Sequence, residues 1–364
     1  MSNAASPIQI GKRICKNRIT MAPTVKFTAG EDGIVTEELI RHYETRAAHG
    51  VGLIVVEATC VAKEARLAPS QLGLWCDEQI EGHRKLVEAV HKHDTLVIPQ
   101  IHYGGLGTHP ACGPLTSPTK VKWDNRFGEV EAQELAREDI KRVINQFVEA
   151  AVRAQKAGYD GVQLHACHAY LINDFASHIN QRTDEYGGSV ENKARFGCEI
   201  IAGIRKACGE DFIISARISG ADPTVAEAKQ VAELYVAAGC DYLQVSCGIG
   251  SFDDVPYEAS LPYNKIVALG VDMHKHFKGR VPVSAVNGIR NVELARYLLE
   301  NDLVDTVDLG CGLLADPAFA EAILDDAPYV KCFSCPDCAF GPGHSHPCPA
   351  TRMRGVHEFA IIPQ

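Results

Sequence analysis

Three side chains that can hold or move protons fall within six residues of the sequence, in the stretch LHACHAYLINDF from Leu164 to Phe175. They are His165, His168 and Tyr170, and they follow the segment GYDGVQ, which is typical of the start of a buried strand. Imidazole and phenol groups are among the side chains that enzymes use for general acid–base catalysis. The stretch is therefore a candidate catalytic site.

Four cysteines near the end of the sequence form a second candidate site. The segment KCFSCPDCAFGPGHSHPCP spaces Cys332, Cys335, Cys338 and Cys348 as C-x₂-C-x₂-C-x₉-C. Three closely spaced thiols and a distant fourth suit a cubane iron–sulfur cluster or a tetrahedral zinc ion. A tail of reduced thiols without metal is the third interpretation. The other ten of the 14 cysteines are scattered, mostly in apolar segments, which indicates small buried side chains.

Eight short apolar runs must position these groups. Most of them lack two-residue alternation, which favours strands of a parallel sheet that is covered on both faces. Helical patterns lie between the runs, and eight such strands predict an α/β fold, a (β/α)₈ TIM barrel. A doubly wound open sheet is the alternative, but no strand is followed by a G-x-G-x-x-G turn. The runs cover residues 17–23, 51–59, 95–103, 158–166, 212–219, 240–248, 281–288 and 303–312.

Three segments fall outside this repeat. Residues 8–18 predict an N-terminal hairpin that closes the bottom of the barrel. Residues 104–136 predict a long polar loop that forms a lid or substrate wall, since long connections usually have a function. We expect residues 1–328 to form the barrel and residues 329–364 a Cys-rich extension packed on it.

Polar residues interrupt the apolar runs where the predicted strands end, which is where barrels of this kind place their active sites. A buried arginine such as Arg217 is costly unless an anion or a dipole meets it. Small residues after the last two strands, Gly288 and Gly310, let backbone N–H groups approach a phosphate closely. A phosphate cradle, a cation and an amide beside the His/His/Tyr set suit a phosphate-bearing cofactor with a polar ring system.

Composition excludes several classes of partner. The net charge of −10 argues against nucleic acid or an anionic membrane as the main partner. No apolar run approaches the roughly 18 residues of a membrane span. The N-terminus, MSNAASPIQIGKR, has no apolar signal core, so we expect a cytoplasmic protein.

The sequence resembles the old yellow enzyme family of FMN-dependent oxidoreductases over nearly its whole length. NRITMAP resembles the family's first-strand motif, and HACHAYLINDFASHINQRTDEYGGSVENKARF resembles its long H-x-x-H-x-Y signature closely. The FMN barrel of the dienoyl-CoA reductase and trimethylamine dehydrogenase branch is the nearest form. In that branch a flavin and pyridine-nucleotide module follows, and we expect it to be missing here because the sequence stops at Gln364.

The resemblance implies roles by position. His165 and His168 would donate hydrogen bonds to a substrate carbonyl oxygen, and Tyr170 would be the proton donor. Gln100 would bind the pyrimidine edge of the flavin, and Arg217 would lie near flavin N1 and stabilise the anionic reduced form. The remaining flavin contacts would come from Pro23, Thr24, Ala58 and Asn287, with backbone near Gly288, Gly310 and Cys311 holding the phosphate.

Four positions depart from the family pattern. Val25 stands where a cysteine or threonine often tunes the flavin, and Tyr103 replaces a usual histidine. Cys311 stands where an arginine usually follows the last strand, so the phosphate contact would fall to the backbone. Phe252 replaces a second catalytic histidine of the dienoyl-CoA reductases, which would leave Tyr170 to act alone.

In that branch a [4Fe–4S] cluster directly follows the barrel with similar cysteine spacing, so the resemblance favours this cluster over zinc. The predicted function is an FMN-dependent ene-reductase that uses NAD(P)H to reduce the C=C bond of an unsaturated carbonyl compound: an enone, a flavone-like enone or an enoyl thioester. A separate protein that donates electrons through the cluster and a homo-oligomer are possible partners. The alternatives are an amine dehydrogenase of the trimethylamine dehydrogenase type, with an aromatic cage, and a non-catalytic electron-transfer subunit.

Overall fold

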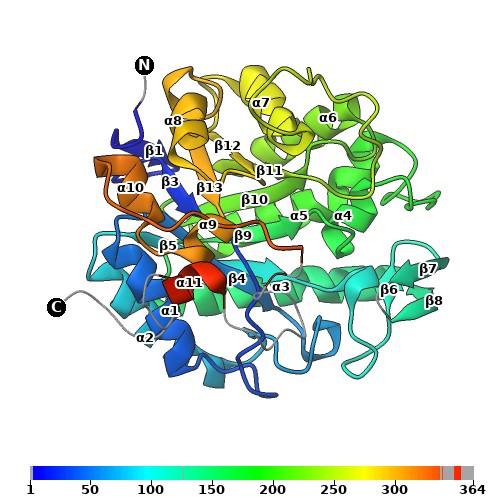
Figure 1. Cartoon of the computed structure of the whole chain (residues 1–364). Coiled ribbons are helices and arrows are strands. Elements are labelled where there is room, and N and C mark those ends of the chain that lie inside the picture. Colours follow the sequence, from blue (N-terminus) through cyan, green and yellow to red (C-terminus); the bar gives the residue numbers. More distant parts are fainter. Residues whose placement is uncertain (1–2, 126, 337, 339–347, 354–364) are drawn as a thin grey trace.

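Eight parallel strands close into a barrel in the computed structural model, which describes residues 3–125, 127–336, 338 and 348–353 (Figure 1). The strand order is β10–β11–β12–β13–β3–β4–β5–β9. Each strand overlaps one of the predicted runs, so the (β/α)₈ barrel is confirmed. The strands are β3 (Ile19–Met21), β4 (Leu53–Cys60), β5 (Leu96–His102), β9 (Gly161–Ala166), β10 (Ile213–Ser219), β11 (Tyr242–Ser246), β12 (Val283–Val286) and β13 (Thr306–Leu309).

Helices surround the barrel and explain why its strands are continuously apolar. Every residue of β4, β9 and β10 is buried, because the barrel interior covers one face of each strand and helices cover the other. The covering helices are α1 (Glu37–Ala48), α2 (Ile80–His91), α3 (Arg137–Ala157), α5 (Val190–Cys208), α6 (Val225–Ala237), α7 (Lys265–Phe277), α8 (Val292–Glu300) and α10 (Phe319–Asp325). Among the described helices, none is both long and apolar enough to cross a bilayer.

Helix α3 shows how local sequence determines an element. Ile140, Phe147 and Ala154 are fully buried on one face, as their spacing predicts. Gly158 ends the helix with φ at 96° and donates its N–H to the carbonyls of Ala154 and Gln155. Glycine suits this cap because a side chain is disfavoured at positive φ.

The predicted hairpin is present at the bottom of the barrel. Strands β1 (Ile8–Ile10) and β2 (Arg13–Cys15) pair antiparallel. Ile10 packs in one apolar cluster with Leu53, Ile98 and Ile213 from three barrel strands. The hairpin therefore closes the end of the barrel opposite to the carboxyl ends of the strands.

The prediction of a long polar loop over residues 104–136 is wrong in one respect, because the segment has secondary structure of its own. The segment contains the short helix η3 (Gly105–Gly107) and a sheet of β6 (Thr116–Ser117), β7 (Val121–Asn125) and β8 (Gly128–Glu134). Trp123 lies opposite Val130 across the β7–β8 pair, and both pack with Leu106 and Leu115. The outward residues of these strands are mostly charged, which hid the alternation. This sheet projects at the right of Figure 1.

Candidate active site

A strained turn at the end of β9 presents the three proton-handling residues. His168 and Ala169 both have positive φ, 63° and 57°, which is uncommon for residues other than glycine. Such positions cost roughly 1–3 kcal/mol each and persist where neighbours hold them. The N–H of His168 donates to the carbonyl of Cys247, and the N–H of Ala169 donates to Asn173 Oδ1 at 2.9 Å. Helix α4 (Leu171–Ala176) begins directly after Tyr170.

The histidines of this turn belong to a longer chain of hydrogen bonds. His165 Nε2 lies 3.0 Å from His168 Nδ1, and His168 Nε2 lies 2.8 Å from the hydroxyl of Ser246. On the other side, His165 Nδ1 lies 3.1 Å from Nδ1 of His102, the last residue of β5. Sequence reasoning assigned no role to His102. The one sequence signal for His102 was its position: it directly precedes Tyr103, where the family pattern usually has a histidine.

The imidazoles of this chain are neutral at physiological pH. Burial lowers the pKa of His102 to about 3. Burial, with Arg217 as the next cause, lowers the pKa of His168 to about 3. The pKa of His165 lies well below its usual value because of burial, with the neighbouring histidines and Arg217 adding to the effect. Each ring therefore has one N–H donor and one acceptor nitrogen.

An open cavity of about 460 Å³ lies in front of this turn. His168 and Tyr170 line it, together with Trp123 and Phe127 from the 104–136 segment. The ring of Tyr170 packs edge-on against His165 at 4.5 Å between centroids. The segment thus forms a wall of the cavity, as expected from its length. His165 itself is buried behind the lining.

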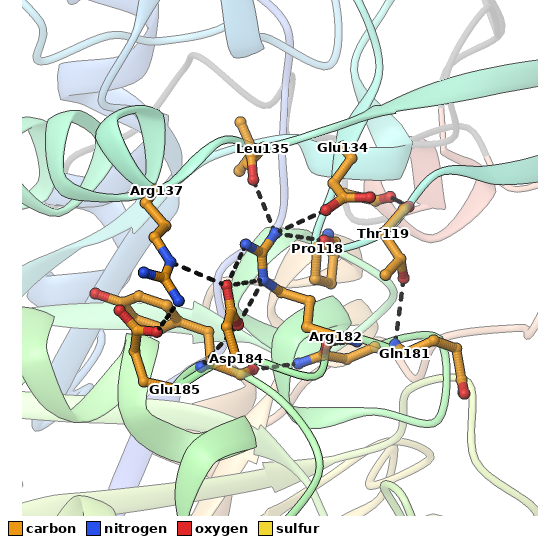
Figure 2. A network of polar contacts seen from close by, with 12 residues as sticks. Pro118, Thr119, Glu134, Leu135, Arg137, Gln181, Arg182, Asp184 and Glu185 are labelled. Carbon is orange, nitrogen blue, oxygen red and sulfur yellow. Dashed lines mark hydrogen bonds and ion pairs between the residues drawn. The ribbon is translucent and has the colours of Figure 1, made fainter.

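Arg182 ties this wall to the barrel (Figure 2). Its guanidinium donates to the backbone carbonyls of Pro118 and Leu135, both at 2.8 Å, and forms a two-nitrogen pair with Asp184. The side chain of Arg182 is only 7% exposed. This part of the N-x-R-x-D signature is therefore structural: it fixes the sheet that supplies Trp123.

A second cavity, of about 330 Å³, meets the first at Thr24, which lines both. The structure brings together here most of the residues predicted to contact a cofactor. They are Pro23, Thr24, Arg217, Asn287, Gly288, Gly310 and Cys311.

These residues fit a phosphate-bearing cofactor. Nε of Arg217 is buried without a hydrogen-bond partner among the described residues, so an acceptor is needed there. Gly288 has a φ of +75°, which favours glycine. Gly310 has open space on its side-chain face: a Cβ there would approach only Thr24 Oγ1, at 3.9 Å, and Gly310 and Thr24 both line this cavity. The backbone of two glycines and the guanidinium of Arg217 therefore line one cavity, an arrangement that can bind an anion such as phosphate.

Arg290 also lines this second cavity, and sequence reasoning missed it. Its Nε is buried without a hydrogen-bond partner within the described ranges. Arg290 lies four residues after the end of β12. In the sequence, the one feature that could have indicated it is a positive charge shortly after Asn287-Gly288. The guanidinium supplies the positive charge that Cys311 does not.

Two predicted cofactor contacts lie outside the linings of both cavities. Ala58 and Gln100 are each 1% exposed. The amide of Gln100 donates to Gln163 Oε1 at 2.9 Å, inside the barrel. Their predicted role as flavin contacts stays a prediction.

Glu57 holds the backbone just after Thr24, the residue that lines both cavities. Its carboxylate accepts the N–H of Lys26 at 3.1 Å and the hydroxyl of Tyr43 at 3.2 Å. Burial raises the pKa of Glu57 to about 7. The carboxyl group therefore anchors the stretch that follows Thr24.

The four tail cysteines line one cavity of about 140 Å³. Cys311 and Arg290 line it too, so this cavity adjoins the one that fits a phosphate. Helix α11 (Pro349–Met353) brings this part of the tail back to the barrel, where Thr351 donates to the carbonyl of Ala315 (Figure 1). Residues 337, 339–347 and 354–364 of the predicted extension lie outside the described residues.

Metal binding at the histidines looked unsuitable from the sequence because no third ligand was evident. The structure supplies one: ligand atoms of His165, Cys167 and His168 lie within 4.8 Å of one another. Burial strongly raises the pKa of the Cys167 thiol, which opposes the thiolate that binds metal. The hydrogen-bond chain therefore remains the better interpretation of these histidines.

Comparisons with known proteins place the chain in one family. Residues 5–328 match the model of the NADH:flavin oxidoreductase / NADH oxidase family. The chain is 36% identical over 346 residues to an NADH oxidase from Thermoanaerobacter brockii, covering 92% of this chain but only 52% of that protein. It is 34% identical over 323 residues to an NADPH dehydrogenase from Bacillus cytotoxicus, covering 86% of this chain and 90% of that protein.

Two solved structures share the fold. A 2-naphthoyl-CoA reductase in complex with 2-naphthoyl-CoA superposes with a TM-score of 0.85 at 25% identity, over 92% of this chain and 54% of that one. An old yellow enzyme homologue from Zymomonas mobilis gives a TM-score of 0.78 at 27% identity, over 91% of this chain and 94% of that one. The chain thus spans about half the length of two of these four proteins.

Proposed function

The chain belongs to the NADH:flavin oxidoreductase / NADH oxidase family, the family of the old yellow enzymes, and from this we propose that it is an FMN-dependent ene-reductase. The observation that carries the proposal is that His168 and Tyr170 line a cavity that meets the phosphate-fitting cavity at Thr24. Bound FMN would supply hydride, taken from NAD(P)H, to the β-carbon of an unsaturated carbonyl compound.

The residues of the chain would hold FMN by its charges. Arg217 and Arg290 offer guanidinium groups to the flavin and its phosphate, and backbone at Gly288 and Gly310 approaches the phosphate closely. Arg217 has the charge that stabilises an anionic reduced ring.

His168 and Tyr170 would act on the substrate. A neutral imidazole donor at the carbonyl oxygen stabilises the negative charge that develops there. Tyr170, which lines the same cavity, would then give its proton to the α-carbon. His165 supports the pair from behind through its 3.0 Å contact with His168.

The cavity favours flat, conjugated substrates. Phe27, Trp123 and Phe127 line it, and aromatic faces stack on planar rings. A flavone-like enone or an aromatic thioester fits this lining, and the likeness to a 2-naphthoyl-CoA reductase supports the second. The same aromatic side chains suit a cationic amine, so amine oxidation is the second candidate. The histidine donors favour the carbonyl, since an ammonium group cannot accept a hydrogen bond.

For the tail we propose a [4Fe–4S] cluster held by the cysteines at 332, 335, 338 and 348. Zinc–sulfur bonds of about 2.3 Å place the thiolates of a zinc site within roughly 4 Å of one another. Among the described residues, no three tail thiols come within 4.8 Å of one another. In a cubane each thiolate binds a different iron, so the four thiolates need not meet at one point. The cluster would pass single electrons between a donor protein and the flavin.

The decisive experiment is anaerobic stopped-flow spectroscopy. The flavin-loaded protein is reduced by NADPH or NADH and mixed with enones or aromatic enoyl thioesters, and in a separate experiment the oxidised protein is mixed with tertiary amines. Reoxidation of the flavin by an unsaturated carbonyl compound supports the proposal. Protein that takes up no flavin would refute it. Reduction of the oxidised flavin by an amine would select the second candidate. Bleaching by NAD(P)H alone would show that no donor protein is required.

A further inference from the structure

His102, His165, His168 and Ser246 form a single file of hydrogen bonds that reaches the substrate cavity at His168. The three links measure 3.1, 3.0 and 2.8 Å. His102 and Ser246 are the buried ends of the file, and His168, beside Ser246, lines the cavity. His102 lines neither cavity, so it can act there only through its contacts with His165 and Tyr170.

Because the rings are neutral, the file has two consistent arrangements of protons. In the first, Ser246 donates to His168 Nε2, and the N–H of each ring points inward to the next. In the second, His102 donates from Nδ1 to His165, His165 donates from Nε2 to His168, and His168 donates from Nε2 to Ser246. A serine hydroxyl both donates and accepts, so Ser246 does not choose between them.

His102, at the inner end of the file, determines which of the two proton arrangements is favoured. Nε2 of His102 is buried and has no hydrogen-bond partner within the described ranges. The first arrangement places a proton on this nitrogen, and the second leaves only a lone pair. A buried N–H without an acceptor is rarer than an acceptor without a donor, so the second arrangement is favoured.

We propose that His102 is a positioning residue that fixes the protons of His165 and His168 on their Nε2 atoms by donating from its own Nδ1. The inference rests on the proposed function, in which a substrate carbonyl oxygen would take the Nε2 proton of His168 in place of the Ser246 hydroxyl. In the opposite arrangement this nitrogen has no proton and repels the oxygen. Donors aligned in one direction also polarise one another, which strengthens the last N–H.

The contact with Tyr170 gives His102 a second restraint. The two rings pack edge-on with centroids 4.5 Å apart, and His165 packs against the same tyrosine at the same distance. Three rings therefore hold one another in place. The pairing of the adjacent strands β5 and β9 brings His102 beside His165, 63 residues further along the chain.

The test is a side-chain ¹⁵N–¹H spectrum of histidine-labelled, flavin-loaded protein, which reports the protonated nitrogen of each ring. In the wild type we expect the proton of His102 on Nδ1 and the protons of His165 and His168 on Nε2. His102→Leu removes the donor, so His165 should become a mixture of both tautomers. His102→Asn keeps an amide donor near the same place and should restore the Nε2 form.

His83→Leu is the matched control, because His83 is another fully buried histidine, bonded to Tyr159 and to the carbonyl of Gly73. It should leave the protons of His165 unchanged. Wild-type His165 protonated on Nδ1, or a His102→Leu spectrum equal to that of the wild type at His165, would overturn the proposal. If His102→Leu does not fold, the wild-type spectrum alone decides.

Enone reduction adds a second readout. His102→Leu should lower kcat roughly tenfold, less than the 10²- to 10³-fold loss on removing a whole donor. FMN affinity should stay unchanged. The spectrum requires no substrate, so failure of the ene-reductase proposal and failure of the role of His102 remain distinguishable.

Discussion

Arg290 and Cys311 together line both the cavity that fits a phosphate and the cavity of the tail cysteines. Cys311 offers no positive charge to these cavities, and Arg290 offers a guanidinium group. Cys311 occupies the place of a family arginine, and Arg290, after a different strand, supplies the guanidinium. One wall of side chains therefore separates the two proposed redox groups.

Arg290→Gln should weaken FMN binding but not riboflavin binding, because only FMN has the phosphate. A hydrogen bond to a charged group contributes roughly 1.5–3 kcal/mol, so FMN affinity should fall about 10- to 100-fold. Quenching of flavin fluorescence measures both dissociation constants. Arg280→Gln, at an exposed ion pair with Glu233, is the control and should change neither. Equal losses for both flavins would mean that Arg290 contacts no phosphate.

Tyr170→Phe should lower the rate of alkene reduction by roughly 10²- to 10⁴-fold while NADPH still reduces the flavin, because only proton donation is lost. Rapid mixing measures the two half-reactions separately. The control is Tyr103→Phe, at a buried tyrosine that lines neither large cavity. If alkene reduction survives in Tyr170→Phe, the α-carbon takes its proton from elsewhere.

Glu57 should make the protein lose stability as the pH rises. Burial raises its pKa to about 7 from 4.5, so the folded state binds a proton that the unfolded state releases between these values. The stabilisation is complete below pH 4.5 and disappears as the pH rises through 7. Between pH 5 and pH 7.5 the unfolding free energy of the wild type should therefore fall by roughly 2 kcal/mol more than that of Glu57→Gln.

Urea denaturation at several pH values measures this difference. Glu37→Gln, at an exposed position at the start of α1, is the control and should follow the wild type. Parallel curves for wild type and Glu57→Gln would show that Glu57 does not titrate in this range.

The tail should bind about four irons per chain if a cubane is present. Cys335→Ser should reduce the iron content and the absorption of the cluster, because it removes one of four ligands. Cys311→Ser should leave the iron content and the cluster absorption unchanged, although Cys311 lines the same cavity. One zinc and no iron per chain would instead identify a zinc site. Iron loss in Cys311→Ser would make Cys311 a ligand.

Arg182→Gln should loosen the sheet that forms the outer wall of the substrate cavity. The substitution removes hydrogen bonds to two backbone carbonyls and a well-buried ion pair (Figure 2). A loss of roughly 3 kcal/mol in stability is expected, with a higher KM for the substrate. Hydrogen exchange should increase in residues 116–134. Arg137→Gln, at a half-exposed arginine that also reaches Asp184, should have a much smaller effect.

The sequence by itself determined the barrel and the location of its catalytic turn. Hydrophobic runs and helix periodicity are local properties, so the eight strands and helix α3 could be predicted from neighbouring residues. His165, His168 and Tyr170 lie within six residues, and their grouping in one turn required no long-range contact. The cysteine spacing similarly predicted a tail in which four thiols share one cavity.

Only the tertiary structure decided which distant residues complete the site. His102 reaches His165 because β5 pairs with β9, and Arg290 reaches Cys311 because the ends of β12 and β13 converge. The sheet within residues 104–136 escaped prediction because its strands are short and their exposed faces are charged. A proton on one nitrogen of His165 depends on a partner 63 residues away, which no local pattern can specify.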